Sequence, residues 1–284
     1  MNAMLETSRA VNYWTHDLSP FLVQFPDAWP WPLGGNGIRW YGLAYIAGFA
    51  IAYLLLLWYH RKKQSPYGAA SVADLATYLI LGVMIGGRLG FMLFYDFELW
   101  LHEPLSIFQI WRGGMSSHGG MIGVTIAAIL FARQRQQSAW QIGDLIVTIT
   151  PPGLMLGRLA NFMNGELWGN PTTVPWAVIF PEADGLPRHP SQLYQAATEG
   201  LLLFCYIQLR FWGKLGPRPL PGQLIGEFLI AYSIVRIGCE FFREPDASLI
   251  LGFSRGQFYS IGTLIAGVIV IGVLVIRKRS ISGQ

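Results

Sequence analysis

The chain has 284 residues, of which 52% are hydrophobic and only 13% are charged, whereas soluble domains carry about 25% charged residues. With a mean hydropathy of +0.39, this composition excludes an ordinary soluble domain and indicates a membrane protein. The formal net charge of +4 does not indicate a nucleic-acid partner, because the basic residues lie at the ends of apolar segments.

The first part of the chain, residues 1–38, mixes aromatic residues, prolines and acids and includes Trp29 and Trp31. Tryptophans beside a membrane entry point are typical of the lipid–water interface. We therefore expect residues 1–38 to form an interfacial segment, as a short surface helix or loop outside the membrane. Residues 39–284 are predicted to form the membrane domain, which includes an outer loop region at about 162–190.

Apolar segments long enough to cross a bilayer follow one another from residue 40 onward. They are predicted at 40–59, 72–95, 115–132, 141–161, 191–212, 222–242 and 257–276. The expected fold is all-α, a polytopic membrane protein with seven transmembrane helices. The two halves show no apparent repeat, which weakens an inverted-repeat transporter interpretation.

Basic residues follow the first, third, fifth and seventh segments and predict the orientation. These connections hold 11 of the 20 basic residues, including all four lysines. The side with this excess should be cytoplasmic. The amino terminus is then outside, the carboxyl terminus is cytoplasmic, and residues 162–190 lie at the outer leaflet.

The fourth segment ends in an unusually polar stretch, Gly157–Gly169. Arg158 and Asn161 are three residues apart and share one helix face, while the glycines that follow allow a sharp turn. An arginine in hydrocarbon costs roughly 2.5–3.5 kcal/mol on insertion scales. The stretch therefore predicts an anion site, and the alternative is an interfacial arginine that extends to water.

Two further arginines, Arg88 and Arg236, lie inside predicted membrane segments. Tyr232, Arg236 and Glu240 form one stripe of a helix, so an intrahelical Arg236–Glu240 ion pair is the alternative to a binding role. Arg88 has no acid beside it. The simplest shared compensator of several unpaired guanidiniums is an anionic ligand, and in an outer leaflet that anion is the phosphate of a phospholipid.

His118 is the histidine whose surroundings suggest chemistry, because Ser117, Gly119 and Gly120 leave room for a substrate. A neutral imidazole can accept a proton near pH 7, although a histidine at a helix end can also be structural. Metal-ligand spacings such as HExxH are missing from the sequence. We predict no metal site and no cofactor.

The stretch Gly157–Gly169 resembles the signature of the bacterial prolipoprotein diacylglyceryl transferases. The resemblance extends to Arg39–Gly42, Gly86–Tyr95, His118–Gly120, His189–Tyr194, Tyr232/Arg236/Glu240 and Arg243–Asp246. It implies a seven-helix protein of the bacterial inner membrane with a periplasmic amino terminus. It also implies transfer of the diacylglyceryl group from phosphatidylglycerol to the lipobox cysteine of a prolipoprotein, with release of glycerol phosphate.

Residue roles follow from matching positions. The resemblance implies that Arg158 and Arg236 are catalytic and that His118 is the proposed base. It also implies that the substrate-binding residues are Tyr41, Asn161, Glu166, Gly169, His189, Tyr232 and Glu240, and the intramembrane charge of Arg88 adds that residue to the predicted set. Three alternatives stay open at this point: thiol activation by the arginine field without His118, a lipid or anion transporter, and a non-catalytic lipid-binding scaffold.

Overall fold

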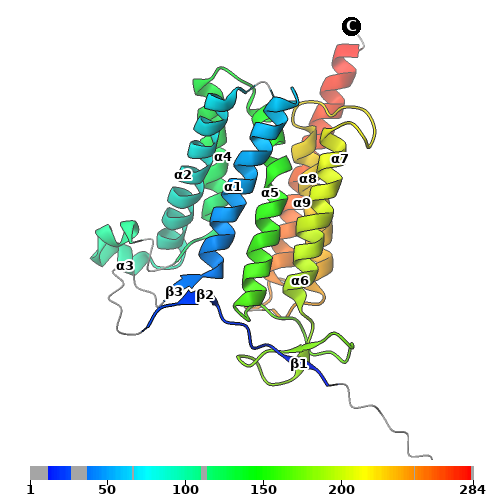
Figure 1. Cartoon of the computed structure of the whole chain (residues 1–284). Helices are drawn as coiled ribbons and strands as arrows, with labels where there is room; N and C mark the ends of the chain where they lie inside the picture. Colours follow the sequence, from blue (N-terminus) through cyan, green and yellow to red (C-terminus); the bar gives the residue numbers. More distant parts are fainter. Residues whose placement is uncertain (1–11, 27–36, 66, 110–113, 246, 283–284) are drawn as a thin grey trace, which may run out of the picture.

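The computed structural model describes residues 12–26, 37–65, 67–109, 114–245 and 247–282, and these are mostly helical (Figure 1). Long helices occupy the positions of all seven predicted segments. They are α1 (Trp40–Arg61), α2 (Ala69–Phe94), α4 (Ser117–Gln134), α5 (Ala139–Met163), the run of α6 (Ser191–Gln195), η3 (Ala196–Leu202) and α7 (Leu203–Phe211), α8 (Gln223–Glu240) and α9 (Arg255–Ser282).

Three helices of the described chain are long and apolar enough to cross a membrane. They are Trp40–Arg61, Ala69–Phe94 and Arg255–Lys278, with mean hydropathies of 1.8, 1.7 and 2.5. Large apolar side chains remain on the outside of the bundle; Ile46, for example, is 67% exposed. An apolar exterior is what a lipid-facing surface requires. Spanning by the other four segments and the orientation of the termini stay predictions.

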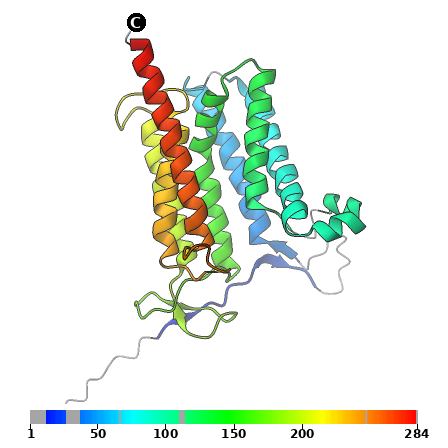
Figure 2. The same ribbon diagram turned by 180° about the vertical axis from the view of Figure 1, so that it is seen from behind.

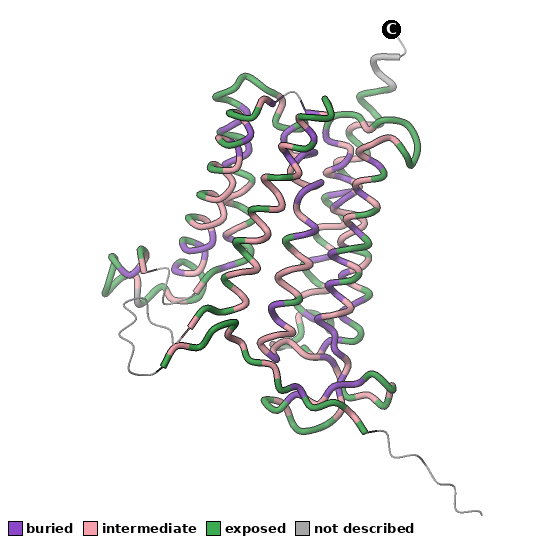
Figure 3. Tube along the Cα trace, viewed as in Figure 1, coloured by how far each residue is buried: buried purple, intermediate pink, exposed green. Residues whose placement is uncertain are grey.

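The helices form two groups that meet at α1 and α5 (Figure 2). In the first group α2 packs closely against α4, where Gly86 and Gly119 bring the backbones together. A Cβ on Gly86 would lie 2.4 Å from the carbonyl oxygen of Gly119. In the second group α8 packs along α9. Buried residues follow the faces that the helices turn to one another (Figure 3).

The amino-terminal segment is extended where the structure describes it, as short strands joined by loops, and of the two expectations only the helix is wrong there. It contains β1 (Trp14–Thr15), β2 (Phe21–Gln24) and β3 (Gly37–Arg39). Strands β2 and β3 pair antiparallel. Strand β1 joins a small sheet with β4 (Val178–Ile179) and β5 (Pro187–Arg188) from the loop after α5. Trp29 and Trp31 lie outside the described residues.

His16 explains why this segment is held against the bundle. Its ring is buried and its Nε2 lies 2.7 Å from the carbonyl oxygen of Phe162, near the end of α5. The ring also packs against Phe162 and Phe180. A main-chain acceptor and two aromatic rings therefore enclose His16 and attach the amino-terminal segment to the end of α5.

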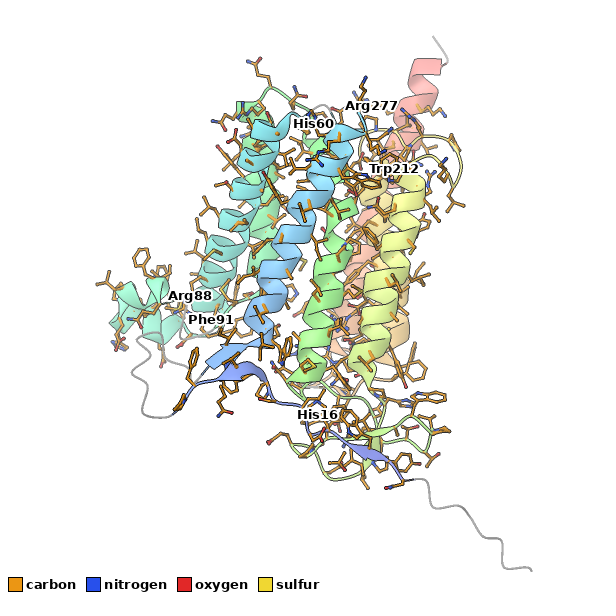
Figure 4. All side chains as sticks on the ribbon, viewed as in Figure 1. His16, His60, Arg88, Phe91, Trp212 and Arg277 are labelled. Carbon is orange, nitrogen blue, oxygen red and sulfur yellow. The ribbon has the colours of Figure 1, made fainter. Side chains whose placement is uncertain are left out.

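The two ends of the bundle differ in composition. Figure 4 shows His60, Trp212 and Arg277 at one end and His16, Arg88 and Phe91 at the other. The first end is also where α1, α4 and α7 finish, so the basic connections predicted from the sequence lie there together. The second end holds the carboxyl terminus of α5 and the small sheet, and it is the end with the polar stretch.

A short helical connection, α3 (Phe97–His102) and η1 (Pro104–Phe108), follows α2 at this second end (Figure 1). It leads to α4, whose first turn is capped by Ser116. The Ser116 side chain accepts a hydrogen bond from the Gly119 amide, the arrangement expected for a serine N-cap. This cap fixes the start of α4 one residue before His118.

Candidate active site

The polar stretch ends α5 as the sequence predicts. Helix α5 stops at Met163, and Gly165 takes a left-handed conformation with φ of +65°. The Gly165 amide donates to the Phe162 carbonyl at 2.9 Å and the Glu166 amide donates to the Asn161 carbonyl at 3.1 Å. These two bonds satisfy carbonyls that a helix end otherwise leaves unpaired. The chain therefore folds back so that Glu166 returns toward α5.

Glu166 and Asn161 form a hydrogen-bonded pair at this turn. Asn161 is buried, and its Nδ2 donates to Glu166 Oε1 at 2.8 Å. Asn164 Nδ2 donates to the same oxygen at 3.3 Å. The backbone carbonyl of Glu166 accepts from Gln192 Nε2 at 2.6 Å. The turn is thus fixed from α5 on one side and from α6 on the other.

One glutamate, Glu199 of η3, holds two of the predicted arginines. Arg158 donates from Nε and Nη2 to Glu199 Oε2 at 3.2 and 3.0 Å. Arg236 donates from Nη1 to Glu199 Oε1 at 3.1 Å. The Glu199 side chain is 0% exposed. Because the two oxygens serve different guanidiniums, this carboxylate joins α5 to α8 through η3.

Arg236 extends the chain of charges to Glu240. Its Nη2 lies 2.6 Å from Glu240 Oε1, the intrahelical ion pair that was one alternative from the sequence. Glu240 also accepts from Ser254 Oγ and packs against Gly256, where a Cβ would lie 2.4 Å from its Cδ. The carboxylate therefore sits at the amino terminus of α9, where the helix dipole favours a negative charge.

We call Arg158, Glu199, Arg236 and Glu240 the hub. Arg243 also contacts this group, with its Nη1 3.5 Å from Glu240 Oε1, so three guanidiniums share two carboxylates. The expectation that Arg158 and Arg236 lack protein partners is wrong. The alternative of an interfacial arginine that extends to water is wrong as well, because Arg158 binds Glu199, whose side chain is buried inside the bundle.

Arg158 keeps one edge of its guanidinium open. Within the part of the chain that the structure describes, its Nη1 has no hydrogen-bond acceptor, while Nε and Nη2 are both used. Its side chain is 17% exposed, compared with 9% for Arg236. Arg236 uses Nη1 for Glu199 and Nη2 for Glu240. Among the described residues no acceptor is found for Arg236 Nε either, so each arginine keeps one donor nitrogen, and Arg158 is the more exposed of the two.

Arg88 differs from the other intramembrane arginines, because main-chain carbonyls surround it. Its Nε, Nη1 and Nη2 donate to the carbonyl oxygens of Ile107, Gly114 and Ser106 at 3.1, 3.1 and 2.6 Å. The residue is 4% exposed. These bonds attach the connection before α4 to α2. They give the buried guanidinium main-chain acceptors, and the substrate-binding role of Arg88 stays a prediction.

His118 lies on the first turn of α4 and is exposed. Its ring makes an edge-on contact with Tyr259 of α9, with the ring centroids 4.8 Å apart. Tyr259 follows Gly256 by three residues, so it lies about one helical turn from the contact between Gly256 and Glu240. The amino-terminal turns of α9 thus contact the hub on one side and His118 on the other.

Comparison with known proteins decides the family. The family model described as prolipoprotein diacylglyceryl transferase matches residues 30–273. The chain is similar to three bacterial proteins named phosphatidylglycerol–prolipoprotein diacylglyceryl transferase. The one from Rhodospirillum rubrum is 46% identical over 92% of this chain and 96% of the relative. Those from Nitrosomonas europaea and Coxiella burnetii are 48% and 47% identical, each over 83% of this chain and over 85% and 90% of the relative.

The chain belongs to the prolipoprotein diacylglyceryl transferase family. This confirms the resemblance drawn from Gly157–Gly169 and identifies the protein as a transferase. Among the described residues of this transferase there is no group of three histidine, cysteine, aspartate or glutamate side chains placed to hold a metal ion.

Two other predicted site residues of the transferase lie on α8 and α1. Tyr232 is one turn before Arg236 on α8, and its ring stacks on Phe228. Tyr41 is the second residue of α1, with its ring against Tyr45. The hydrogen bonds recorded for the described residues do not join Tyr41, Tyr232 or His118 to the hub, so their roles stay predictions.

Gly169 and His189 lie in the loop between α5 and α6, where two stretches of backbone hydrogen-bond to each other outside the bundle. The Gly169 amide donates to the His189 carbonyl at 2.9 Å, and a Cβ on Gly169 would lie 2.4 Å from the Phe242 carbonyl oxygen. Only glycine fits there. His189 Nδ1 lies 3.0 Å from the Tyr194 hydroxyl, and burial lowers the pKa of His189, so its ring is neutral at neutral pH. Both residues shape the loop; substrate contact by either stays a prediction.

Sequence reasoning missed two buried residues of the transferase. Glu199 lies in the predicted segment 191–212, where an acid is as costly in hydrocarbon as an arginine and equally indicates a site. Gln195, one turn before Glu199, is fully buried, and neither amide atom has a partner among the described residues. Glu199 also sits in a π-helical stretch, a feature often found at functional sites. The single acid of an apolar segment was the available signal.

Proposed function

We propose that this chain transfers the diacylglyceryl group from phosphatidylglycerol to the lipobox cysteine thiol of a prolipoprotein. The relatives that it matches over most of its length carry the name of this activity. The observation that supports the assignment within the structure is the open Nη1 of Arg158, held in place by Glu199. A guanidinium with two nitrogens fixed by protein and one free is suited to receive a phosphate oxygen.

The reaction exchanges a C–O bond for a C–S bond. The cysteine thiol gives its proton to His118, the proposed base, and the thiolate attacks the carbon of the diacylglyceryl moiety that bears the phosphate ester. A thioether forms at that carbon, and glycerol phosphate leaves with the electron pair of the broken C–O bond. Arg158 is proposed to hold the phosphate and to stabilise the charge that grows on the departing oxygen, an effect worth a few kcal/mol per well-placed donor.

The remaining hub residues are proposed to position Arg158. Arg236 holds the second oxygen of Glu199, and Glu240 fixes Arg236 against the start of α9. Asn161 and Glu166 fix the turn that follows Arg158 on α5. Tyr232 lies beside the hub on α8 and is proposed to orient the glycerol moiety.

The membrane arrangement is part of the proposal. Seven helices cross the bacterial inner membrane, with the amino terminus periplasmic and the carboxyl terminus cytoplasmic. The basic connections at one end of the bundle support this orientation, since α1, α4 and α7 all finish there. The hub then lies in the half of the membrane nearer the periplasm, where it meets phosphatidylglycerol and the hydrophobic signal segment of the prolipoprotein.

A product assay tests the function. The purified full chain is incubated with phosphatidylglycerol and a lipobox peptide, and the peptide mass is then measured. We expect a mass increase equal to one diacylglyceryl group and an equal amount of glycerol phosphate. Lipid binding without a mass increase would favour a lipid-binding scaffold, and movement of lipid between leaflets without it would favour a transporter.

His118→Gln tests the proton acceptor. A free cysteine thiol has a pKa of about 8.5, so at pH 7 it benefits from a base, and general base catalysis contributes about 10²–10⁴-fold. We expect His118→Gln to lower kcat/KM by about 100-fold at pH 7 and by much less at pH 9, where the thiol ionises unaided. His60→Gln, at the other end of the bundle, serves as the control. Equal activity of His118→Gln and wild type at pH 7 would leave activation to the arginines alone.

A further inference from the structure

A cleft lies at the end of the bundle opposite the hub. It has a volume of about 350 Å³ and is lined by Trp58, Lys62, Gln208, Leu209, Trp212 and Lys214. Figure 4 shows Trp212 at this end, beside the end of α1 marked by His60 and far from Arg88 and His16. A volume of this size falls in the range of small-molecule binding sites, about 300–1,000 Å³. The proposed transfer reaction makes no use of it.

The aromatic wall of the cleft is held in place by the protein itself. The Trp212 indole donates from Nε1 to Gln208 Oε1 at 3.1 Å, and Gln208 Nε2 donates to the Thr148 carbonyl at 3.0 Å and also to the Tyr59 hydroxyl. The Trp58 and Trp212 rings lie 4.8 Å apart. Because these bonds consume both ends of the Gln208 amide, the wall is apolar and preformed.

The rim of the cleft is positively charged. Lys62 caps the carboxyl end of α1, and Lys214 follows α7 by three residues. Among the described residues neither lysine takes part in an ion pair, whereas the acids near this end are engaged elsewhere. Glu227 binds Arg210, and Asp144 accepts the amides of Gly222 and Ile225. Two uncompensated ammonium groups therefore flank an apolar wall.

We propose that this cleft binds an anionic phospholipid from the leaflet at that end of the bundle. The phosphate would lie between the ammonium groups of Lys62 and Lys214, and an acyl chain would lie against Trp58 and Leu209. A free phosphate would satisfy the lysines but leave the apolar wall open, and a zwitterionic lipid adds no net negative charge. The inference depends on the bundle spanning a membrane and is independent of the transfer chemistry.

The test measures lipid binding to the full chain in detergent micelles by native mass spectrometry. Phosphatidylserine is the probe, because it is anionic and differs in head group from the proposed substrate; phosphatidylcholine is the uncharged comparison. A lysine near an anionic lipid contributes about 1 kcal/mol, so removing both predicts about 30-fold weaker binding. We expect the double variant Lys62→Gln/Lys214→Gln to bind phosphatidylserine about 30-fold more weakly than the wild type.

A matched control removes the same charge at the same end but away from the cleft. Arg133→Gln/Arg135→Gln changes two exposed arginines at the end of α4 and should bind phosphatidylserine as the wild type does, and so should Arg158→Ala in the hub. Equal losses in the two double variants would overturn the proposal, because bulk charge would then explain the binding. Full displacement by inorganic phosphate, or equal phosphatidylcholine binding, would overturn it as well.

Discussion

Replacing Glu199 with glutamine is expected to abolish most transfer activity and to destabilise the folded protein together. The glutamate is fully buried and its two oxygens bind Arg158 and Arg236 separately. Glutamine has nearly the same shape but no charge, and it replaces one acceptor oxygen with a donor that faces a guanidinium. Arg158 would then lose its carboxylate partner, and Arg236 would keep only Glu240.

The size of both effects follows from the burial. Removing one partner of a buried ion pair costs about 3–5 kcal/mol, because the remaining charge is left uncompensated. Denaturation in mixed micelles should show a loss of this order for Glu199→Gln. Transfer by the folded fraction should fall by about 10²–10³-fold in kcat/KM, the loss typical of one misplaced electrostatic donor.

Glu227→Gln separates the two effects. Glu227 forms a comparable pair with Arg210, from Nη2 at 2.7 Å and from Nε at 2.8 Å, at the opposite end of the bundle. This variant should also lose stability, but the folded fraction should keep its kcat/KM. If Glu199→Gln lost stability to the same extent and kept wild-type kcat/KM when folded, Glu199 would be structural alone and the hub would have no part in transfer.

Much of the architecture could be predicted because it depends on local pattern. Hydrophobic length placed helices at all seven predicted segments, and the stripe of Arg236 and Glu240 produced the ion pair that spacing alone allows. The left-handed Gly165 ends α5 where the glycines indicated a turn. Each of these features is decided by residues within about one or two helical turns of one another.

The partner of Arg158 could not be predicted in this way, because it comes from a distant part of the chain. Glu199 is 41 residues from Arg158 and 37 from Arg236, and only the packing of α5, η3 and α8 brings them together. The expectation that these two arginines lack protein partners is therefore wrong. The lipid phosphate is therefore proposed to contact Arg158 at Nη1, which has no acceptor among the described residues, and it is not the partner of the whole guanidinium.

Main-chain partners account for other differences between sequence and structure. Arg88 is surrounded by three carbonyls of the connection before α4, and His16 by the Phe162 carbonyl. Every residue type supplies such carbonyls, so a sequence carries no sign of which ones face a given side chain. A charged or polar residue in an apolar region thus marks a buried polar contact more reliably than it identifies the partner.

Replacing Arg158 with lysine should impair transfer almost as severely as replacing it with alanine. The guanidinium performs two tasks, since Nε and Nη2 bind Glu199 while Nη1 stays free for the phosphate. A lysine ammonium is a single point of charge and cannot hold the carboxylate side-on while it presents a separate donor. We expect kcat/KM to fall by about 10²–10³-fold, the usual cost of losing one preorganised donor to a transition state.

Whether Arg158→Lys changes kcat or KM shows which state of the reaction Arg158 stabilises. A donor that acts mainly on the departing oxygen should lower kcat and kcat/KM together, whereas one that binds the ground-state lipid should raise KM. Arg210→Lys is the matched control, because Arg210 also binds a glutamate through two nitrogens but lies at the remote end. Its folded fraction should transfer normally. Near wild-type transfer by Arg158→Lys would show that the fork geometry is not needed, and the phosphate contact would then have to be assigned to another residue.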